Sequence, residues 1–253
     1  MIYIATHKKF NVPNLNGYCA LQVGAEGKEK YGYLRDNIGN HISGKNANYC
    51  ELTGLYWIWK NTDDSYKGLV HYRRYFGRNN LSNKISDICS YEYLLNCLKS
   101  VDIVLPYVEY FKQNAKEEIL LHCCTEEIFD KLRQIIETKY PDYIETYDRY
   151  FNENKASLFN MLFCKREIFD AYCEWLFDIL FELTKRFEGT EYNSFHARYP
   201  GRISEVLLDV WMNENGYTYK EVPFVYMEKI NMFKKGMGFL KAKFLHKKYG
   251  ESF

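Results

Sequence analysis

The string GLVHYRRYFGR, residues 68–78, carries two adjacent arginines directly after a short apolar run. His71, Tyr72, Arg73 and Arg74 come where a predicted strand ends, and open α/β sheets bind ligands at the carboxyl ends of their strands. Guanidinium groups match the oxygens of phosphates, and an unpaired charge in a core is costly. The string predicts either a cationic site for a diphosphate or two arginines paired with structural carboxylates, and the residues alone favour neither.

A second group of polar residues lies before and inside a predicted helix over 46–61. Asp36 belongs to a glycine-containing loop, and Lys45 with the free backbone amides of the helix start would suit an anion. Glu51 follows among aromatic residues. It is either a ligand-binding carboxylate or a residue that the positive end of the helix stabilises, and we favour the second interpretation.

A third string, ARYPGRISEVLLDVWM at residues 197–212, places a carboxylate where a loop meets a helix. Ser204 is the predicted N-cap of a helix that runs to Asn215 and is closed by Gly216. Glu205 would then lie in the first helical turn. There it is either a positioned general base or a residue that stabilises the helix start, and the sequence favours neither.

Composition argues against several classes of protein. The 253 residues include 34 basic and 33 acidic side chains, a balance that disfavours non-specific nucleic-acid binding. No apolar run approaches the roughly 18 residues of a membrane span, and the start MIYIATHKK lacks the pattern of a secretory signal. The 8 cysteines form no CxxC pair, so we expect reduced thiols in a cytoplasmic protein. The 18% aromatic content is expected mostly in the core.

Strand and helix patterns alternate along the chain, which predicts an α/β sheet with helices on its faces. Strands are expected over 2–5, 68–72, 101–105, 157–163 and 218–227, helices over 46–61, 126–140, 166–187 and 204–215, and loops over 10–45. We interpret residues 1–228 as one domain. The basic tail at 229–253 is either an amphipathic element at a membrane surface or a solvated helix packed on protein.

Several of these strings together resemble a bacterial family of polysaccharide-biosynthesis glycosyltransferases that was long catalogued as a domain of unknown function. The strings are ATHKKF, QVGA, DNIGNHISGKN, YCELTGLYWIWKN, GLVHYRRYF, VDIVLP, FNMLFCKREIFDAYCEWLFDIL and GRISEVLLDVWM, and they cover about residues 1–227. One of them departs from the family, whose usual GFLSER appears here as GRISEV. A large apolar residue has thus become Arg202, whereas the Ser-Glu pair is kept.

The resemblance implies a single GT-A-like, Rossmann-like domain with a mostly parallel central sheet and helices on both faces. It also implies transfer of a sugar, with galactopyranose and galactofuranose as the expected candidates, from a UDP-sugar to a lipid-linked or growing polysaccharide. Capsule, exopolysaccharide and O-antigen synthesis are the processes in which such enzymes act. The expected place is the cytoplasm, with contact to the inner face of the plasma membrane through the tail.

The resemblance further implies a reaction without a metal cofactor. GT-A enzymes usually place Asp-x-Asp at the end of a central strand to hold a divalent metal, and here that strand ends in His71-Tyr72-Arg73-Arg74. We expect the positive side chains to replace the charge of the metal. The alternative is that Mn²⁺ or Mg²⁺ is still used, with His71 nearby.

Roles for individual residues follow from the same resemblance. Glu205 would be the general base of an inverting displacement, and Arg73 and Arg74 would stabilise the leaving diphosphate. The other expected donor-binding residues are His7, Lys8, Asp36, Lys45, Asn46, His71 and Asn160, and the expected acceptor-binding residues are Tyr56, Trp57, Arg198 and Arg202.

Two other functions remain open from the sequence. A non-catalytic nucleotide- or sugar-binding module of a polysaccharide assembly complex would use the same aromatic residues and arginines. A nuclease or phosphotransferase would use the arginines on phosphate, but the sequence offers no Asp/His metal cluster for one.

Overall fold

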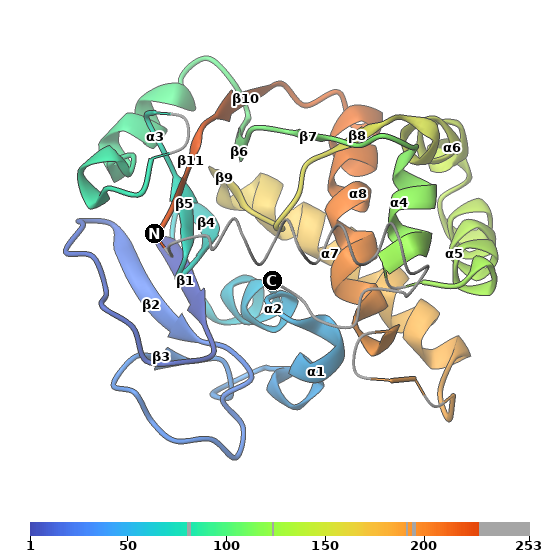
Figure 1. Cartoon of the computed structure of the whole chain (residues 1–253), viewed down its shortest axis with the longest axis horizontal. Coiled ribbons are helices and arrows are strands. Elements are labelled where there is room, and N and C mark those ends of the chain that lie inside the picture. The colour runs from blue at the N-terminus through green and yellow to red at the C-terminus, as the bar shows by residue number, and fades with distance from the viewer. Residues whose placement is uncertain (80–81, 123, 191, 194–195, 228–253) are drawn as a thin grey trace, which may run out of the picture.

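Seven strands lie side by side in the central sheet, in the order β10–β6–β9–β4–β1–β2–β3 (Figure 1). The computed structural model describes residues 1–79, 82–122, 124–190, 192–193 and 196–227. The strands of the sheet, with the two that extend it, are β1 (Ile2–Thr6), β2 (Tyr18–Gln22), β3 (Leu34–Arg35), β4 (Tyr66–His71), β5 (Arg74–Phe76), β6 (Ile103–Pro106), β9 (Leu162–Lys165), β10 (Tyr219–Val222) and β11 (Phe224–Tyr226). A separate small sheet pairs β7 (Glu109–Tyr110) with β8 (Lys155–Ala156).

The strands of this path run in one direction with a single exception. β3, β2, β1 and β4 are parallel, and β10 is parallel to β6. β9 is antiparallel to both of its neighbours, β4 and β6. The expected α/β fold with a mostly parallel sheet is confirmed. Beyond the path, β5 turns back from β4 and pairs with β11.

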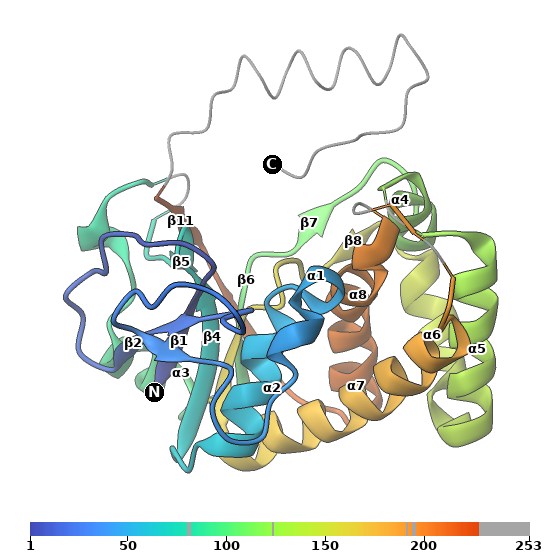
Figure 2. The ribbon, with the colours of Figure 1, turned by 90° about the horizontal axis from the view of Figure 1, so that it is seen from below.

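Helices cover both faces of the sheet, as expected (Figure 2). Along β1, Tyr3 and Ala5 face the larger core while Ile2 and Ile4 face a second one, because side chains alternate along a strand. Helices α2, α7 and α8 cover the larger core, and α3 with β5 and β11 closes the second. The helices are α1 (Asn46–Tyr49), α2 (Leu52–Asn61), α3 (Tyr91–Cys97), α4 (Ala115–His122), α5 (Glu126–Lys139), α6 (Ile144–Asn152), α7 (Arg166–Arg186) and α8 (Tyr199–Glu214).

Apolar periodicity predicted the longest helix correctly. The stripe expected for residues 166–187 is fully buried in α7, where it packs on the sheet and on α2, α5 and α8. Its members are Phe169, Tyr172, Leu176, Ile179 and Leu183.

The helix predicted over 46–61 is interrupted, which corrects that prediction. Cys50 has a φ of 52°, in the left-handed region that ends a helix, so α1 stops at Tyr49 and α2 begins at Leu52. The Asn46 side-chain amide donates to the Cys50 carbonyl oxygen at 2.7 Å and stabilises the break. The break leaves Glu51 between two short helices.

Two predicted strands are also broken. Residues 157–161 are irregular because Phe159 and Asn160 have φ values of 76° and 51°, and the chain becomes a strand only at β9. The predicted strand 218–227 divides at Pro223, which has no backbone N–H. Its halves, β10 and β11, pair with different strands, β6 and β5.

Other elements were not predicted at all. β2 and β3 lie in the segment expected to be loops, and no helix was predicted at α3, α4 or α6. Helix α8 begins at Tyr199, so Ser204 is inside the helix and is not its N-cap. In the described part of the chain, no helix is both long and apolar enough to span a bilayer. The predicted membrane-surface tail lies outside the described residues.

Candidate active site

Strand β4 brings the two arginines to the middle of the sheet, because it lies between β1 and β9. It ends at His71, and Arg74, opposite His71 in the antiparallel register, opens β5. Tyr72 and Arg73 form the tight turn between the two strands. The arginines therefore lie at the carboxyl end of a central strand, where ligands of open α/β sheets bind.

Arg74 is partly buried between two aromatic rings. Its Cζ lies 4.3 Å from the ring centroid of Phe159 and 5.1 Å from that of Tyr226. Its buried Nε has no hydrogen-bond partner among the described residues. Burial lowers the pKa of Arg74, and the charge of Arg73 adds to that effect, whereas Glu51 is among the groups that oppose it. Arg74 therefore has a buried donor with no partner among the described residues, and its charge interacts with that of Glu51.

Arg73 belongs to a group of cations around the ring of Tyr72. The Cζ of Arg73 lies 5.8 Å from the Tyr72 centroid, and Lys8 Nζ lies 4.8 Å from it. The imidazole of His7 meets the same ring edge-on at a centroid distance of 5.4 Å. Side chains that follow β1 and β4 thus meet at one end of the sheet.

The charge around His7 is strongly positive. Burial lowers the pKa of His7, and four cations lower it further: Lys8, Arg73, Lys28 and Arg198. Like charges this close repel one another, so an anion bound among them would be favoured electrostatically.

Glu205 lies in α8 at 7% exposure, and its charge interacts with that of Arg74. Its Oε1 accepts a hydrogen bond from the Phe159 N–H at 3.0 Å, and its Oε2 is 3.9 Å from a guanidinium nitrogen of Arg202. Burial raises the pKa of Glu205 to about 7, and Glu51 adds to the rise. Arg202, the Phe159 N–H and Arg74 oppose it. A carboxyl group with such a pKa can accept a proton near neutral pH.

Glu51 is a member of the site for which the sequence interpretation favoured a structural role. Its Oε1 accepts from the Asn160 side-chain amide at 2.9 Å. Its charge acts on Glu205, Arg74 and His71. A glutamate near a helix start is usually a structural residue, and the break at Cys50 that aims it at the site gives no signal in the sequence.

His71 is held in one orientation. Its Nε2–H donates to the Phe159 carbonyl oxygen at 2.6 Å. Burial lowers the pKa of His71, and Arg74 and Arg73 lower it further, while Glu51 opposes them. The imidazole is thus favoured in its neutral form.

Three other predicted donor-binding residues have contacts elsewhere. Asp36 is buried and accepts from the backbone N–H groups of Gly24 and Ala25 and from the Ser43 hydroxyl. Asn46 binds the Cys50 carbonyl oxygen and the Thr53 hydroxyl, at 2.7 and 3.1 Å. Lys45 Nζ lies 5.7 Å from the ring centroid of Phe181 on α7. These contacts shape the loops beside the site, and the contact of Lys45 with Phe181 does not support a role at the expected diphosphate.

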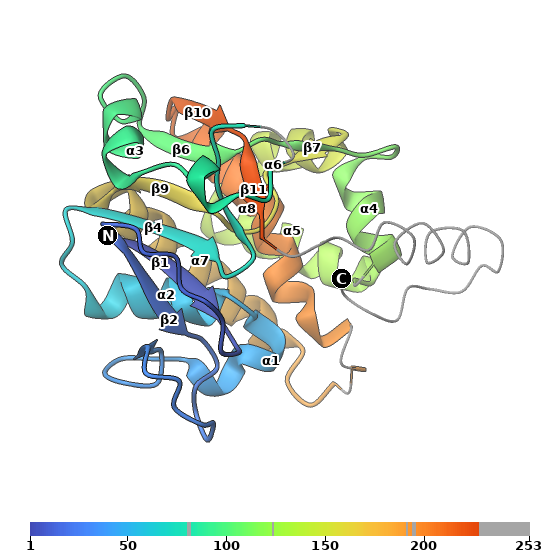
Figure 3. The same ribbon diagram turned by 60° about the vertical axis from the view of Figure 1, so that its left-hand side comes forward.

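Of the predicted acceptor-binding residues, the two aromatic ones lie in the core. The Tyr56 hydroxyl donates to Asn40 Oδ1 and Trp57 Nε1–H donates to the Ile38 carbonyl oxygen, so both polar ends are satisfied. Their placement does not support acceptor binding, because the core needs their apolar surface. Arg198 and Arg202 do lie at the site, where Arg198 Nε–H donates to Cys50 Sγ at 3.0 Å. Figure 3 shows α1 beside the start of α8, which carries Arg202.

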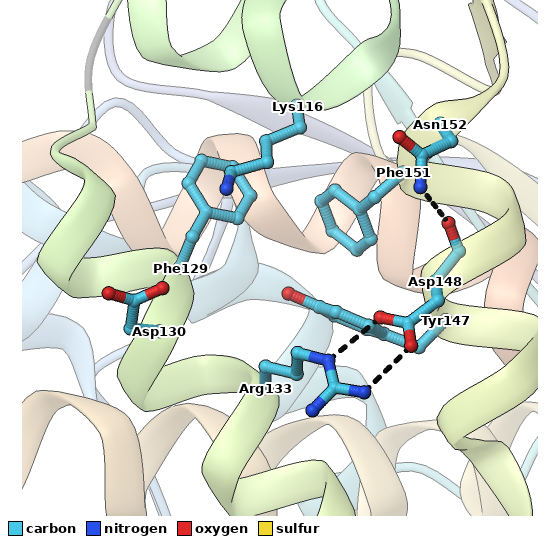
Figure 4. A pocket seen from close by; sticks show the side chains of 8 residues that line it. All are labelled: Lys116, Phe129, Asp130, Arg133, Tyr147, Asp148, Phe151 and Asn152. Atoms are coloured by element: carbon cyan, nitrogen blue, oxygen red, sulfur yellow. Dashed lines mark hydrogen bonds and ion pairs between the residues drawn. The ribbon is translucent and has the colours of Figure 1, made fainter.

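A separate pocket of about 170 Å³ lies between α4, α5 and α6 (Figure 4). Its aromatic floor is Phe129, Tyr147 and Phe151, and its rim includes Arg133 and Asp148. Arg133 donates to both carboxylate oxygens of Asp148, at 2.9 and 2.8 Å. Because its principal charges bind each other, this pocket offers less to an anionic ligand than the sheet edge does. Among the described residues, no group of three or more His, Cys, Asp or Glu side chains could hold a metal.

A search of solved structures found a protein of similar architecture. The chain is similar to WbbM, a bifunctional glycosyltransferase solved in its apo form, with a TM-score of 0.80 and 25% sequence identity over 90% of this chain. The chain spans 45% of the length of that chain. A search of curated proteins finds no match.

The sheet order and the similarity to WbbM define a chain with a GT-A-like fold. Residues 1–216 match the family described as "Domain of unknown function (DUF4422)". The chain belongs to that family, and the expected membership of a family catalogued as a domain of unknown function is confirmed.

Proposed function

We propose that this protein is a glycosyltransferase that moves a sugar from a nucleotide-sugar donor to a sugar acceptor in polysaccharide synthesis. The likeness to WbbM supports the general class of reaction. The observation that carries the proposal is the buried carboxyl of Glu205, with a pKa near 7, beside the cationic turn that ends β4. A proton acceptor and a group of cations are the two parts that such a transfer needs.

The proposed reaction is a single displacement with inversion at the anomeric carbon. The acceptor hydroxyl oxygen attacks that carbon, and its proton passes to the carboxylate of Glu205. The bond from the anomeric carbon to the phosphate oxygen breaks, and its electron pair leaves with the nucleoside diphosphate. Negative charge therefore develops on the diphosphate, and preorganised cations can stabilise it.

The cations divide into two groups by position. Arg73 and Lys8 lie with the imidazole of His7 around the ring of Tyr72, and we assign the diphosphate to this side because positive charge gathers there. The charge of Arg74 interacts with those of Glu51 and Glu205, so we assign Arg74 to the region between the diphosphate and the proton acceptor. This division is consistent with a reaction in which side chains replace a metal, and metal independence remains part of the proposal.

The finer assignments remain proposals that rest on the family resemblance. They are a UDP donor that carries galactopyranose or galactofuranose, a lipid-linked or growing polysaccharide acceptor, and action in the cytoplasm at the inner face of the plasma membrane. Membrane contact was expected from residues 229–253, which lie outside the described residues.

The test is a panel of UDP-, GDP-, CMP- and dTDP-sugars, first for binding and then for transfer. A bound donor raises the melting temperature by mass action. We expect UDP-sugars to raise it and UDP to be released when a saccharide acceptor is added. Binding without release for every acceptor would favour the non-catalytic binding module, and neither binding nor release would overturn the proposal.

A further inference from the structure

The segment between β8 and β9 contains two consecutive left-handed residues that are not glycine. Phe159 has a φ of 76° and Asn160 a φ of 51°. A left-handed backbone costs a residue with a Cβ about 1–2 kcal/mol of conformational free energy. Two such residues in succession therefore persist only where many contacts hold them. The contacts made by this turn are with the members of the candidate site.

Phe159 contacts three of those members. Its N–H donates to Glu205 Oε1 at 3.0 Å, and its carbonyl oxygen accepts from His71 Nε2–H at 2.6 Å. Its ring lies 4.3 Å from the Cζ of Arg74. One residue therefore fixes the relative positions of side chains that come from β4, β5 and α8.

Asn160 uses all the hydrogen-bonding groups of its amide and is 1% exposed. Its Nδ2 donates to Glu51 Oε1 at 2.9 Å and to the Gly201 carbonyl oxygen at 3.1 Å. Its Oδ1 accepts from the Ser204 hydroxyl at 2.8 Å. The amide thus links Glu51 to the first turns of α8 and has no donor left for a substrate.

The start of the same segment is held by α8 as well. Asp209 accepts from the backbone N–H of Ser157 at 2.8 Å and from its hydroxyl at 2.6 Å. Asp209, Glu205 and Ser204 therefore bind three successive parts of the segment 157–160. This arrangement explains how a strained turn is kept.

We propose that Asn160 is a positioning residue, which holds the Phe159–Asn160 turn so that Glu205, Glu51 and Arg74 keep the spacing needed for transfer. This inference rests on the proposed function, and it replaces the donor-binding role expected for Asn160. The buried, saturated amide acts on the reaction through Glu205 and Glu51.

The proposal has a consequence for the proton affinity of Glu205. The Phe159 N–H lowers the pKa of Glu205 against the effect of burial. If the turn relaxes, this bond weakens and the pKa of Glu205 rises above about 7. The charged and titratable groups that face Glu205 are Arg202 on its own helix, Glu51, Arg74 on β5 and Tyr172 on α7.

The first variant is Asn160→Gly, which removes the amide and tolerates the left-handed backbone. We expect kcat to fall by about tenfold to a hundredfold, because a small displacement of reacting groups has that effect, while KM for the donor changes less than about threefold. The acid limb of the pH–rate profile should move to higher pH. Asn152→Gly, the same exchange at the exposed end of α6, is the control. It should leave kcat, KM for the donor and the acid limb unchanged.

A second variant keeps the test possible if Asn160→Gly does not fold. Ser204→Ala removes only the bond to Asn160 Oδ1 and a bond to the Gly201 carbonyl oxygen, and should shift kcat and the acid limb in the same direction by less. Unchanged kcat and an unmoved acid limb in a folded variant would overturn the inference.

A titration of the Glu205 carboxyl carbon by NMR separates this inference from the proposed function. If the wild type transfers no sugar from any donor, the proposed function fails. The titration still decides on positioning, since a higher Glu205 pKa in Asn160→Gly than in the wild type supports it and equal values contradict it.

Discussion

Glu205 is the residue on which the proposed chemistry depends most. Glu205→Gln keeps an acceptor for the Phe159 N–H but cannot take up a proton. We expect kcat to fall by about 10²–10⁴, the usual contribution of a general base, while UDP still raises the melting temperature. Sugar transfer is measured with Glu214→Gln, near the end of the same helix, as the control. Transfer at the wild-type rate by Glu205→Gln would remove Glu205 from the role of base.

Arg73 should act on the binding of the diphosphate. Arg73→Gln removes a cation from the group around Tyr72, and a hydrogen bond to a charged partner contributes about 1.5–3 kcal/mol. We therefore expect UDP affinity, measured by calorimetry, to fall by at least about tenfold. Arg78→Gln is the matched control, because Arg78 lies beyond β5 against the ring of Tyr93. Equal affinities in the two variants would place the diphosphate elsewhere.

At this scale the sequence revealed part of the site. It pointed to Arg73, Arg74, His71 and Glu205 because charged side chains next to apolar runs are visible in a string of letters. Asn160 was named only through the family resemblance, and the structure brings it close to His71 and Glu205 through the Phe159–Asn160 turn. The sequence left Glu51 between a ligand-binding and a structural role and favoured the structural one, because the direction of that side chain depends on one left-handed residue. It also assigned Tyr56 and Trp57 to the acceptor, although both lie in the core.

Short irregular segments between the regular elements are what align the site. The left-handed backbone at Cys50 aims Glu51, and the left-handed pair at Phe159 and Asn160 joins β4 to α8. Periodicity predicts continuous elements at both places, over 46–61 and 157–163, because the residues there have apolar spacing. Tertiary contacts override that local preference, and they cannot be read from the sequence.

The loop after β2 offers a test of an element that supports the site. Gly24 has a φ of +58°, and a Cβ there would lie 2.4 Å from Asn46 Cγ. Gly24→Ala should destabilise the protein by about 1–3 kcal/mol more than the left-handed backbone alone would cost. Gly27→Ala isolates the backbone cost, since Gly27 has a φ of +68° and no atom within 4 Å of that Cβ. Equal melting temperatures for the two variants would contradict the close contact with Asn46.

The sequence predicts the class of the fold, but it does not predict which strands pair or in which direction they run. Alternating strand and helix patterns give an α/β sheet because each element must bury one face. The antiparallel direction of β9 and the separate partners of β10 and β11 depend on contacts between distant segments. No local pattern contains that information.

The distribution of charge over the molecule predicts how the reaction responds to metals and salt. The net charge is only +1, so the cations around His7 are a local concentration and not a general property of the surface. We expect sugar transfer to persist in EDTA and UDP affinity to decrease as salt is added. Transfer lost in EDTA and restored by Mn²⁺ would show that a metal, and not the arginines alone, carries the diphosphate.

The buried carboxyls should make the stability of the whole protein depend on pH. Burial raises the pKa of Glu205 from 4.5 to about 7 and that of Asp209 from 3.8 to about 6. Since the folded state holds these protons more tightly, their stabilising effect is complete below the unfolded pKa values and is lost as pH rises through the folded ones.

For Glu205 this loss is on the order of 2–3 kcal/mol between about pH 4.5 and 8. Glu205→Gln does not titrate, so its free energy of unfolding relative to the wild type should increase by that amount over the same interval. Denaturant unfolding at several pH values measures the free energy of unfolding of the variant and of the wild type. The other carboxyls contribute equally to both and cancel when the two values are subtracted. Glu214→Gln serves as the control on the same helix. Parallel curves for Glu205→Gln and the wild type would mean that Glu205 is ionised as easily in the fold as in the unfolded chain. The site would then lack the proton acceptor with a raised pKa on which the proposed transfer depends.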